Sequence, residues 1–187
     1  MAKRLLLSAG FLLLVLVASA VYRNSVIVSA FPAETHTLLK VTSNITSFIN
    51  SIIALLIYAA IFYFAYSVAK AFDSAVALSD YLDLVADMLY YFCLVEGVKV
   101  IFALLFLEGS LVNIEPDETI NIQLMSTVWY RYNLLTDVVG LVGLPLFAYY
   151  TLHRTESATK RQAVLVALAL FLGFALLNVY MLIPDKA

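Results

Sequence analysis

Five long runs of apolar residues, separated by short polar segments, dominate the pattern of the chain. Each run is long enough for a transmembrane helix, which needs roughly 17–25 predominantly apolar residues. The pattern therefore predicts an all-α polytopic membrane helix bundle of five transmembrane helices, in a single membrane domain over residues 1–187. The predicted spans cover about residues 5–22, 45–69, 82–108, 126–151 and 163–183.

The first apolar run allows two interpretations. Lys3 and Arg4 precede it and Ala18-Ser19-Ala20 stand near its end, a pattern typical of a cleavable signal peptide. Read through to Tyr22, the same run is long enough for a spanning helix. We favour the retained helix, and the downstream topology is the same under either interpretation.

The composition makes lipid the expected surroundings. The chain is 64% hydrophobic and 13% charged, with a mean hydropathy of +0.96. Soluble domains are nearer 45–50% apolar and about 25% charged. A soluble core of this size could not bury so much apolar surface, so we expect the lipid bilayer to cover the excess. The formal net charge of −2 and the lack of a basic patch argue against a nucleic-acid partner.

The positions of Lys and Arg predict the orientation, because cytoplasmic loops carry an excess of both. With the amino terminus inside, the inner side holds Lys3, Arg4, Lys70, Arg154, Lys160 and Arg161. The outer side then holds Arg23, Lys40, Arg131 and Lys186. We therefore expect an integral protein of the plasma or inner membrane, with its amino terminus in the cytoplasm and its carboxyl terminus outside.

Three charged residues lie inside the predicted spans. Glu96 and Lys99 are three residues apart in the third span, so they share one helical face. At ~1.5 Å per residue, Lys99 lies ~13 Å and Asp137 ~12 Å below the outer surface, in neighbouring antiparallel spans. The predicted intramembrane polar cluster consists of Glu96, Lys99, Asp137, Asn50 and Asn178, with Thr136 as a further hydrogen-bonding neighbour.

This cluster has two possible roles. In the first, Lys99 neutralises Asp137 or Glu96 and the network fixes the register of the helices. In the second, one of the two acids is left over, titrates, and moves protons or binds a cation. We favour the structural role.

A stripe of acids precedes the third span. Asp80, Asp83 and Asp87 follow one another at i, i+3 and i+7, on one helical face. Carboxylates near a helix N-terminus are favourable without any ligand. We therefore interpret the stripe as a solvated helix turn rather than a cation site.

Motifs of known catalysts do not occur in the chain. There is no H-E-x-x-H, G-x-S-x-G, Walker-type loop or G-x-G-x-x-G. Cys93 lies alone in an apolar run, and His36 and His153 fall on opposite sides of the predicted membrane, which disfavours haem or zinc ligation. We expect no enzymatic activity, no cofactor and no metal site.

The last third of the chain carries a family resemblance. It reads W-Y-R-Y-N-L-L-T-D-V-V-G-L from Trp129, then a short basic loop and K-R-Q-A-V-L-V from Lys160. The places of Gly140-Leu141, Thr159-Lys160 and Ala163 resemble those in the Yip-type (Rab-interacting) family of five-span membrane proteins, including its prokaryotic members. The resemblance implies a non-enzymatic membrane adaptor, and it supplies no catalytic residues.

Two functions from different classes follow from these patterns. The first is a non-enzymatic scaffold or accessory subunit of a membrane assembly, with the lipid bilayer and another membrane protein as partners. The alternative is a small transporter or channel that moves protons or cations through Glu96, Lys99 and Asp137. A lipid-handling role is neither supported nor excluded by the sequence.

Overall fold

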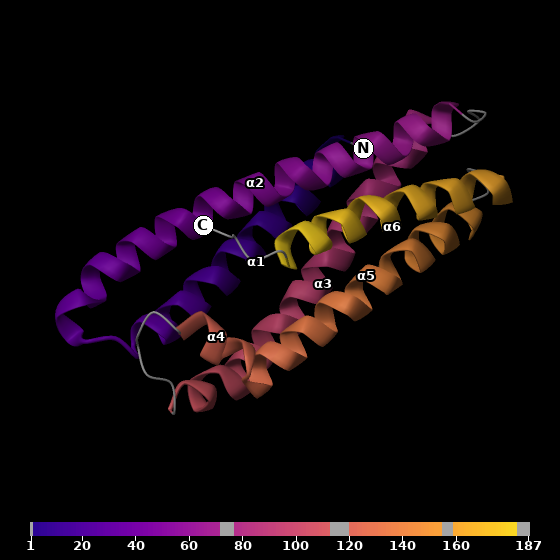
Figure 1. The fold of residues 1–187 in the computed structure, drawn as a ribbon. Coiled ribbons are helices and arrows are strands. Elements are labelled where there is room, and N and C mark those ends of the chain that lie inside the picture. Colours follow the sequence, from indigo (N-terminus) through magenta and orange to yellow (C-terminus); the bar gives the residue numbers. More distant parts are fainter. Residues whose placement is uncertain (1, 72–76, 113–119, 155–158, 183–187) are drawn as a thin grey trace. The chain divides into compact units, whose positions relative to one another are not determined.

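The chain folds into helices. The structure is a computed structural model that describes residues 2–71, 77–112, 120–154 and 159–182 (Figure 1). In these ranges all regular elements are helical and no strand occurs, which confirms the predicted all-α class. The predicted place of Lys186 on the outer side and the predicted last residue of the fifth span fall outside the described residues.

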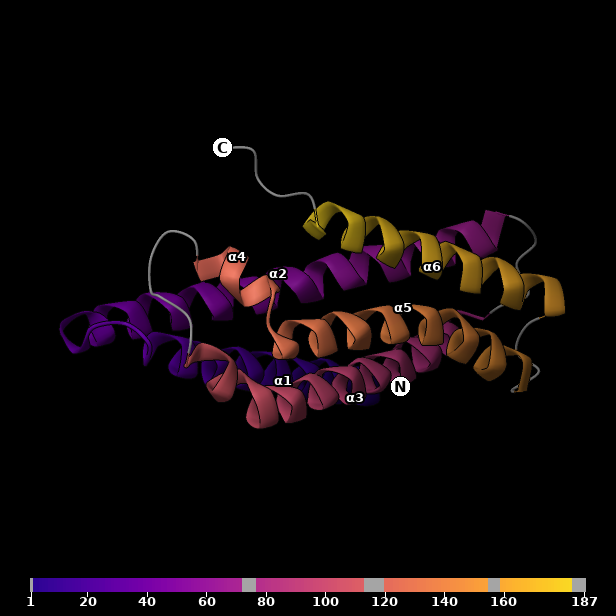
Figure 2. The ribbon, with the colours of Figure 1, turned by 60° about the horizontal axis from the view of Figure 1, so that its bottom comes forward.

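Five of the helices are long and apolar enough to cross a membrane, which confirms the predicted number of spanning helices in the described part of the chain. Figure 2 shows them from a second direction. Their apolar side chains are exposed in large numbers, as expected for helices that meet lipid. The five are α1 (Ala2–Val28), α2 (His36–Ala71), α3 (Leu78–Leu111), α5 (Val128–Arg154) and α6 (Lys160–Leu182).

The first two helices are longer than predicted. The sequence pattern indicated a polar connector over residues 23–43, but α1 ends at Val28 and α2 begins at His36, after the short 3₁₀ helix η1 (Ala33–Thr35). One polar side chain of the extra turns is paired across the hairpin, where Asn24 Nδ2 donates to the Ser43 carbonyl at 3.1 Å and to Ser47 Oγ at 2.8 Å. Polarity alone therefore does not end these helices.

One helix was not predicted. The short helix α4 (Ile120–Met125) lies where the sequence indicated a polar loop. Its Leu124 joins a buried cluster with Leu107 of α3 and Trp129 of α5. A helix of six residues has fewer than two turns, too few for its periodicity to be recognised.

The chain divides into two compact units. Unit one comprises Met1–Ala9, Leu55–Tyr91 and Val139–Ala187, and unit two comprises Gly10–Ala54 and Phe92–Val138. Helices α1, α2, α3 and α5 contribute segments to both units, whereas α4 belongs to unit two and α6 to unit one. That the whole chain acts as a single membrane domain stays a prediction.

Helix α6 packs closely against α2 in unit one. A Cβ atom added to Gly173 would lie 2.7 Å from Ile61 Cγ2, closer than real Cβ atoms approach a neighbour. Beside this contact, the ring of Phe174 lies edge-on to Tyr58, with 5.2 Å between the ring centroids. The small residue lets the two backbones approach, which is the usual way that helices associate in a membrane.

Candidate intramembrane charge site

The candidate site begins with one ion pair on α3. Lys99 Nζ lies 2.8 Å from Glu96 Oε1, within hydrogen-bonding distance. The two residues are three positions apart in a continuous helix, so their side chains share a face and the longer lysine can reach back to the acid. The local helix geometry alone therefore creates this pair.

Helix α5 contributes the second acid. Asp137 Oδ1 forms an ion pair with the same Lys99 Nζ. An ammonium group carries three donors and can therefore serve two carboxylates at once. Lys99 therefore pairs with two carboxylates of unit two and connects α3 to α5.

The three side chains differ in exposure. Lys99 and Glu96 are 12% and 13% exposed, whereas Asp137 remains 34% exposed. Lys and Glu are almost never so deeply buried without a partner, because removing a charge from water is costly. The pair on α3 is therefore the buried part of the site, and Asp137 is its accessible edge.

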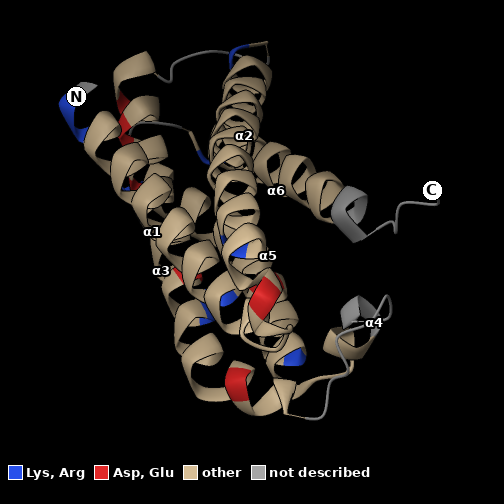
Figure 3. Ribbon diagram, turned by 90° about the vertical axis from the view of Figure 1, so that its left-hand side faces the viewer, with Lys and Arg blue, Asp and Glu red and all other residues tan. Residues whose placement is uncertain are grey.

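Aromatic rings flank the site in unit two. Tyr132 of α5 stacks on Phe102 and Phe106 of α3, with centroid distances of 4.9 and 5.1 Å. Phe102 follows Lys99 by one turn, so the stack lies between the charges and the α3 end that leads to α4. Figure 3 shows how few charged residues these helices carry. The stacked rings give α3 and α5 an apolar contact beside the ion pairs.

Two of the predicted members take no part in the ion pairs. The side chain of Asn50 is exposed on α2, and Asn178 Nδ2 donates to the Phe174 carbonyl in its own helix at 2.8 Å. No hydrogen bond in the described ranges joins either amide to the charges. Thr136 likewise donates within its own helix, to the Tyr132 carbonyl at 2.8 Å. The candidate site is therefore restricted to Glu96, Lys99 and Asp137, which we call the charge triad.

One neighbour was missed in the sequence. Asn133 lies one turn before Asp137 on α5, and its Oδ1 is buried without a hydrogen-bond partner among the described residues. A buried acceptor without a partner costs about 1–3 kcal/mol, so such groups are rare in folded proteins. Asn133 and Asp137 are four residues apart and therefore share one helical face, which is the feature of the sequence that could have identified this neighbour.

A second group of charges lies in unit one. Arg4 of α1 hydrogen-bonds to Asp87 of α3, and its Nη1 lies 3.6 Å from Asp83 Oδ1. Arg4 and Asp83 are nearly half exposed, so this contact adds little stability. The sequence predicted that Arg4 and these aspartates lie on the inner side of the membrane, but it did not predict that they pair. Among the described residues, no group of three or more His, Cys, Asp or Glu side chains could hold a metal ion.

The five apolar helices define the class, a multi-pass helical membrane protein. No family model, curated protein or solved structure matches the chain. The Yip-type resemblance therefore stays a prediction.

Proposed function

We propose that this protein is a non-enzymatic scaffold or accessory subunit of a membrane assembly. The observation that carries the proposal is the double contact of Lys99, whose ammonium group engages both Glu96 and Asp137. Charges that bind one another in this way hold two helices in register. A fixed register preserves the outer surface that another membrane protein would recognise.

The outer surface supports the same proposal. Long aliphatic side chains are exposed along α2 and α3, such as Leu56 at 65% and Leu105 at 65%. Surfaces of this kind pack against lipid or against the helices of another membrane protein. We further propose that the amino terminus lies in the cytoplasm and the carboxyl terminus outside, in a plasma or inner membrane, because Lys and Arg favour that orientation.

Partner recovery tests the scaffold role. We expect the tagged full chain, purified from native membranes in a mild detergent, to bring one other membrane protein in a fixed ratio. Glu96→Gln should retain that partner, because the amide still accepts a hydrogen bond from Lys99. Recovery of this chain alone would contradict the proposal.

A small transporter or channel for protons or cations is the second candidate. The observation that favours it is the excess of acid, two carboxylates around one ammonium, with Asp137 the most exposed of the three. Ionisable residues at bilayer depth often mark proton or ion paths.

Flux measurements separate the two candidates. A transporter should carry protons or cations in proteoliposomes, with the flux lost on Glu96→Gln and kept on Lys40→Gln, since Lys40 is exposed near the start of α2 and is not part of the charge triad. A scaffold should show no flux with any of these chains. The Yip-type resemblance, if it reflects common descent, would add weight to the scaffold.

A further inference from the structure

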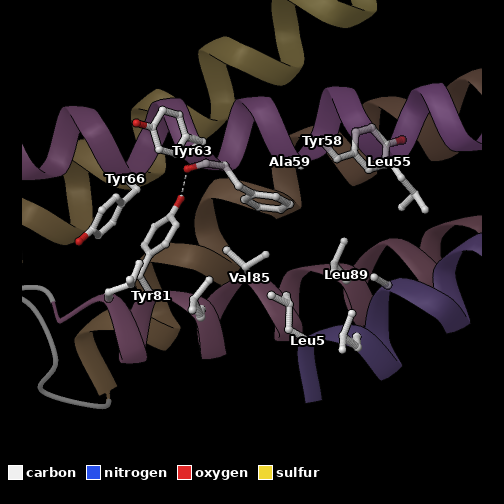
Figure 4. Close-up of a pocket in the computed structure, with 14 residues that line it drawn as sticks. Leu5, Leu55, Tyr58, Ala59, Tyr63, Tyr66, Tyr81, Val85 and Leu89 are labelled. Carbon is white, nitrogen blue, oxygen red and sulfur yellow. Dashed lines mark hydrogen bonds between the residues drawn. The ribbon is translucent and has the colours of Figure 1, made fainter. Parts of the chain in front are cut away.

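Unit one contains an apolar groove that the charge triad does not use. It lies between the start of α1, the second half of α2 and the first half of α3, with a volume of about 350 Å³ (Figure 4). All its lining residues are Leu, Val, Ala, Phe or Tyr. Phe62, Val85 and Leu89 form buried parts of its wall. Such a lining selects hydrocarbon over water.

The groove has a tyrosine end at Tyr66 and Tyr81 and a leucine end at Leu55 and Leu89, where Tyr58 also lies (Figure 4). At one end the rings of Tyr66 and Tyr81 lie 5.0 Å apart, close to the end of α2. The Tyr81 hydroxyl donates to the Phe62 carbonyl at 2.6 Å, so its own hydrogen bond is already made. The tyrosine end differs from the leucine end in its place on the helix, because it lies within about one turn of the end of α2 at Ala71. A headgroup at the membrane–water interface would therefore lie at the tyrosine end.

The length of the groove matches one leaflet of a bilayer. From Leu55 to Tyr66, eleven steps of ~1.5 Å give ~16 Å along α2. The hydrocarbon core of a bilayer is about 30 Å thick, so one leaflet contributes about 15 Å. A single lipid chain that enters at the tyrosine end would therefore reach the leucine end.

A positive charge stands at the tyrosine end. Lys70 follows Tyr66 by four residues in α2, which places it on the groove face one turn further toward the helix end. It is exposed. A lysine in this position attracts the phosphate of a lipid headgroup.

The nearby acids lie on another face of α3. The groove is lined by Leu78, Tyr81, Leu82, Val85 and Leu89, which cluster around one direction of the helix. Asp80 follows Leu78 by two residues, or ~200° of rotation, and Asp83 and Asp87 share its side. Arg4 contacts the last two acids. Among the described residues of α2 and α3, helical spacing thus places the positive charge of Lys70, and none of these three acids, on the groove face.

We propose that this groove binds one hydrocarbon chain of an anionic membrane lipid. The chain lies along Val85 and Leu89 with its end near Leu55, and the headgroup phosphate binds Lys70. The contacts that a chain makes with the wall would be lost in an empty groove, so occupancy is favourable. The proposal is independent of the scaffold or transport role.

A matched pair of substitutions tests the position of the chain. Ala59 and Ala60 are adjacent and exposed, but Ala59 lines the groove and Ala60 does not. The full-length chain is reconstituted in nanodiscs that contain equal amounts of phosphatidylglycerol and phosphatidylcholine, and it is then extracted in mild detergent. Native mass spectrometry measures how many molecules of each lipid stay bound. The wild-type chain and Ala60→Phe should each retain one phosphatidylglycerol. Ala59→Phe should retain about tenfold less, because its ring displaces at least two methylene groups of the chain.

A second pair tests the headgroup. Lys70→Gln should retain phosphatidylglycerol and phosphatidylcholine equally, whereas Lys40→Gln should keep the preference for phosphatidylglycerol. A diazirine-labelled phosphatidylglycerol should crosslink the wild-type chain along residues 55–66, a readout that needs no variant.

Three outcomes would overturn the proposal. Equal retention by Ala59→Phe and Ala60→Phe would show annular lipid only. Crosslinks spread evenly over all helices would show the same. A wild-type dimer that is lost on Ala59→Phe would show that a second copy of the chain, rather than a lipid, occupies the groove.

Discussion

At the scale of single residues, the charge triad shows that the stability of a buried charge depends on whether it has a partner of opposite sign. Lys99 is 12% exposed and lies in the apolar stretch of α3 that follows the acidic stripe. Two carboxylates surround its ammonium group, so removing the lysine leaves both acids without their counter-charge. Breaking a buried pair costs far more than replacing the whole pair by apolar groups.

This asymmetry predicts the outcome of a double-mutant cycle. Lys99→Ala should lower the free energy of unfolding by about 3–5 kcal/mol, because Glu96 and Asp137 are left unpaired. The double variant with Asp137→Ala should lose less, since one orphaned acid is removed with the lysine. Unfolding by detergent titration in mixed micelles measures both changes.

The exposed Lys40 supplies the control for this cycle. Lys40→Ala should change the free energy of unfolding by less than about 0.5 kcal/mol, as is usual for surface positions. A double variant less stable than Lys99→Ala would show that Lys99 and Asp137 are not partners.

At the scale of elements, close packing in unit one depends on a glycine of α5. The Tyr91 hydroxyl of α3 donates to the Gly140 carbonyl at 3.0 Å, and its ring stacks on Phe147 with 5.6 Å between centroids. A Cβ atom on Gly143 would collide with that hydroxyl. The small residue at 143 therefore makes room for the hydrogen bond between the two helices.

We expect Gly143→Ala to destabilise the protein by about 1–3 kcal/mol relative to Gly109→Ala, because the Tyr91 hydroxyl must move from its acceptor. Gly109 is the matched control, since a Cβ atom there meets nothing within 4 Å. Detergent unfolding measures the difference.

The cause of the effect can be isolated with a second change. In a Tyr91→Phe background the clashing oxygen is absent, so Gly143→Ala should cost less there than in the wild-type chain. An equal cost in both backgrounds would show that the hydroxyl does not limit the packing.

At the scale of the whole molecule, the proposed orientation rests on the distribution of charge. Five membrane crossings, if all five apolar helices span the bilayer, would place the two termini on opposite sides. The basic residues at the start of α1, the end of α2 and the α5–α6 connection all share the predicted inner side, including Lys3, Lys70 and Arg161. A cell retains such segments in the cytoplasm.

Reporter fusions check this orientation. A carboxyl-terminal alkaline phosphatase, active only outside the cytoplasm, should be active, and a carboxyl-terminal green fluorescent protein exported through the same route should stay dark. The same two reporters at the end of α2, after Lys70, should give the opposite result. A fluorescent carboxyl-terminal fusion would reverse the proposed topology.

Much of the architecture could be predicted from the sequence, because long apolar runs have few alternatives to spanning helices. The number of such helices was confirmed. Their ends were less predictable, since α2 begins at His36 rather than near Ile45. Polar residues such as Asn24 and Ser43 satisfy one another across a hairpin, and single-sequence periodicity does not show that contact.

The sequence by itself determined the helical class, the number of long apolar helices and the shared face of Glu96 and Lys99, because these depend on composition and on local spacing along one helix. The tertiary structure alone decided which distant residues meet. It showed that Lys99 contacts Glu96 and Asp137 together, where the sequence had left the choice open, and it brought Arg4 to Asp87 and three helices around the groove at Val85. Such contacts depend on how helices rotate about their axes, and that rotation follows from packing across the bundle rather than from any one segment.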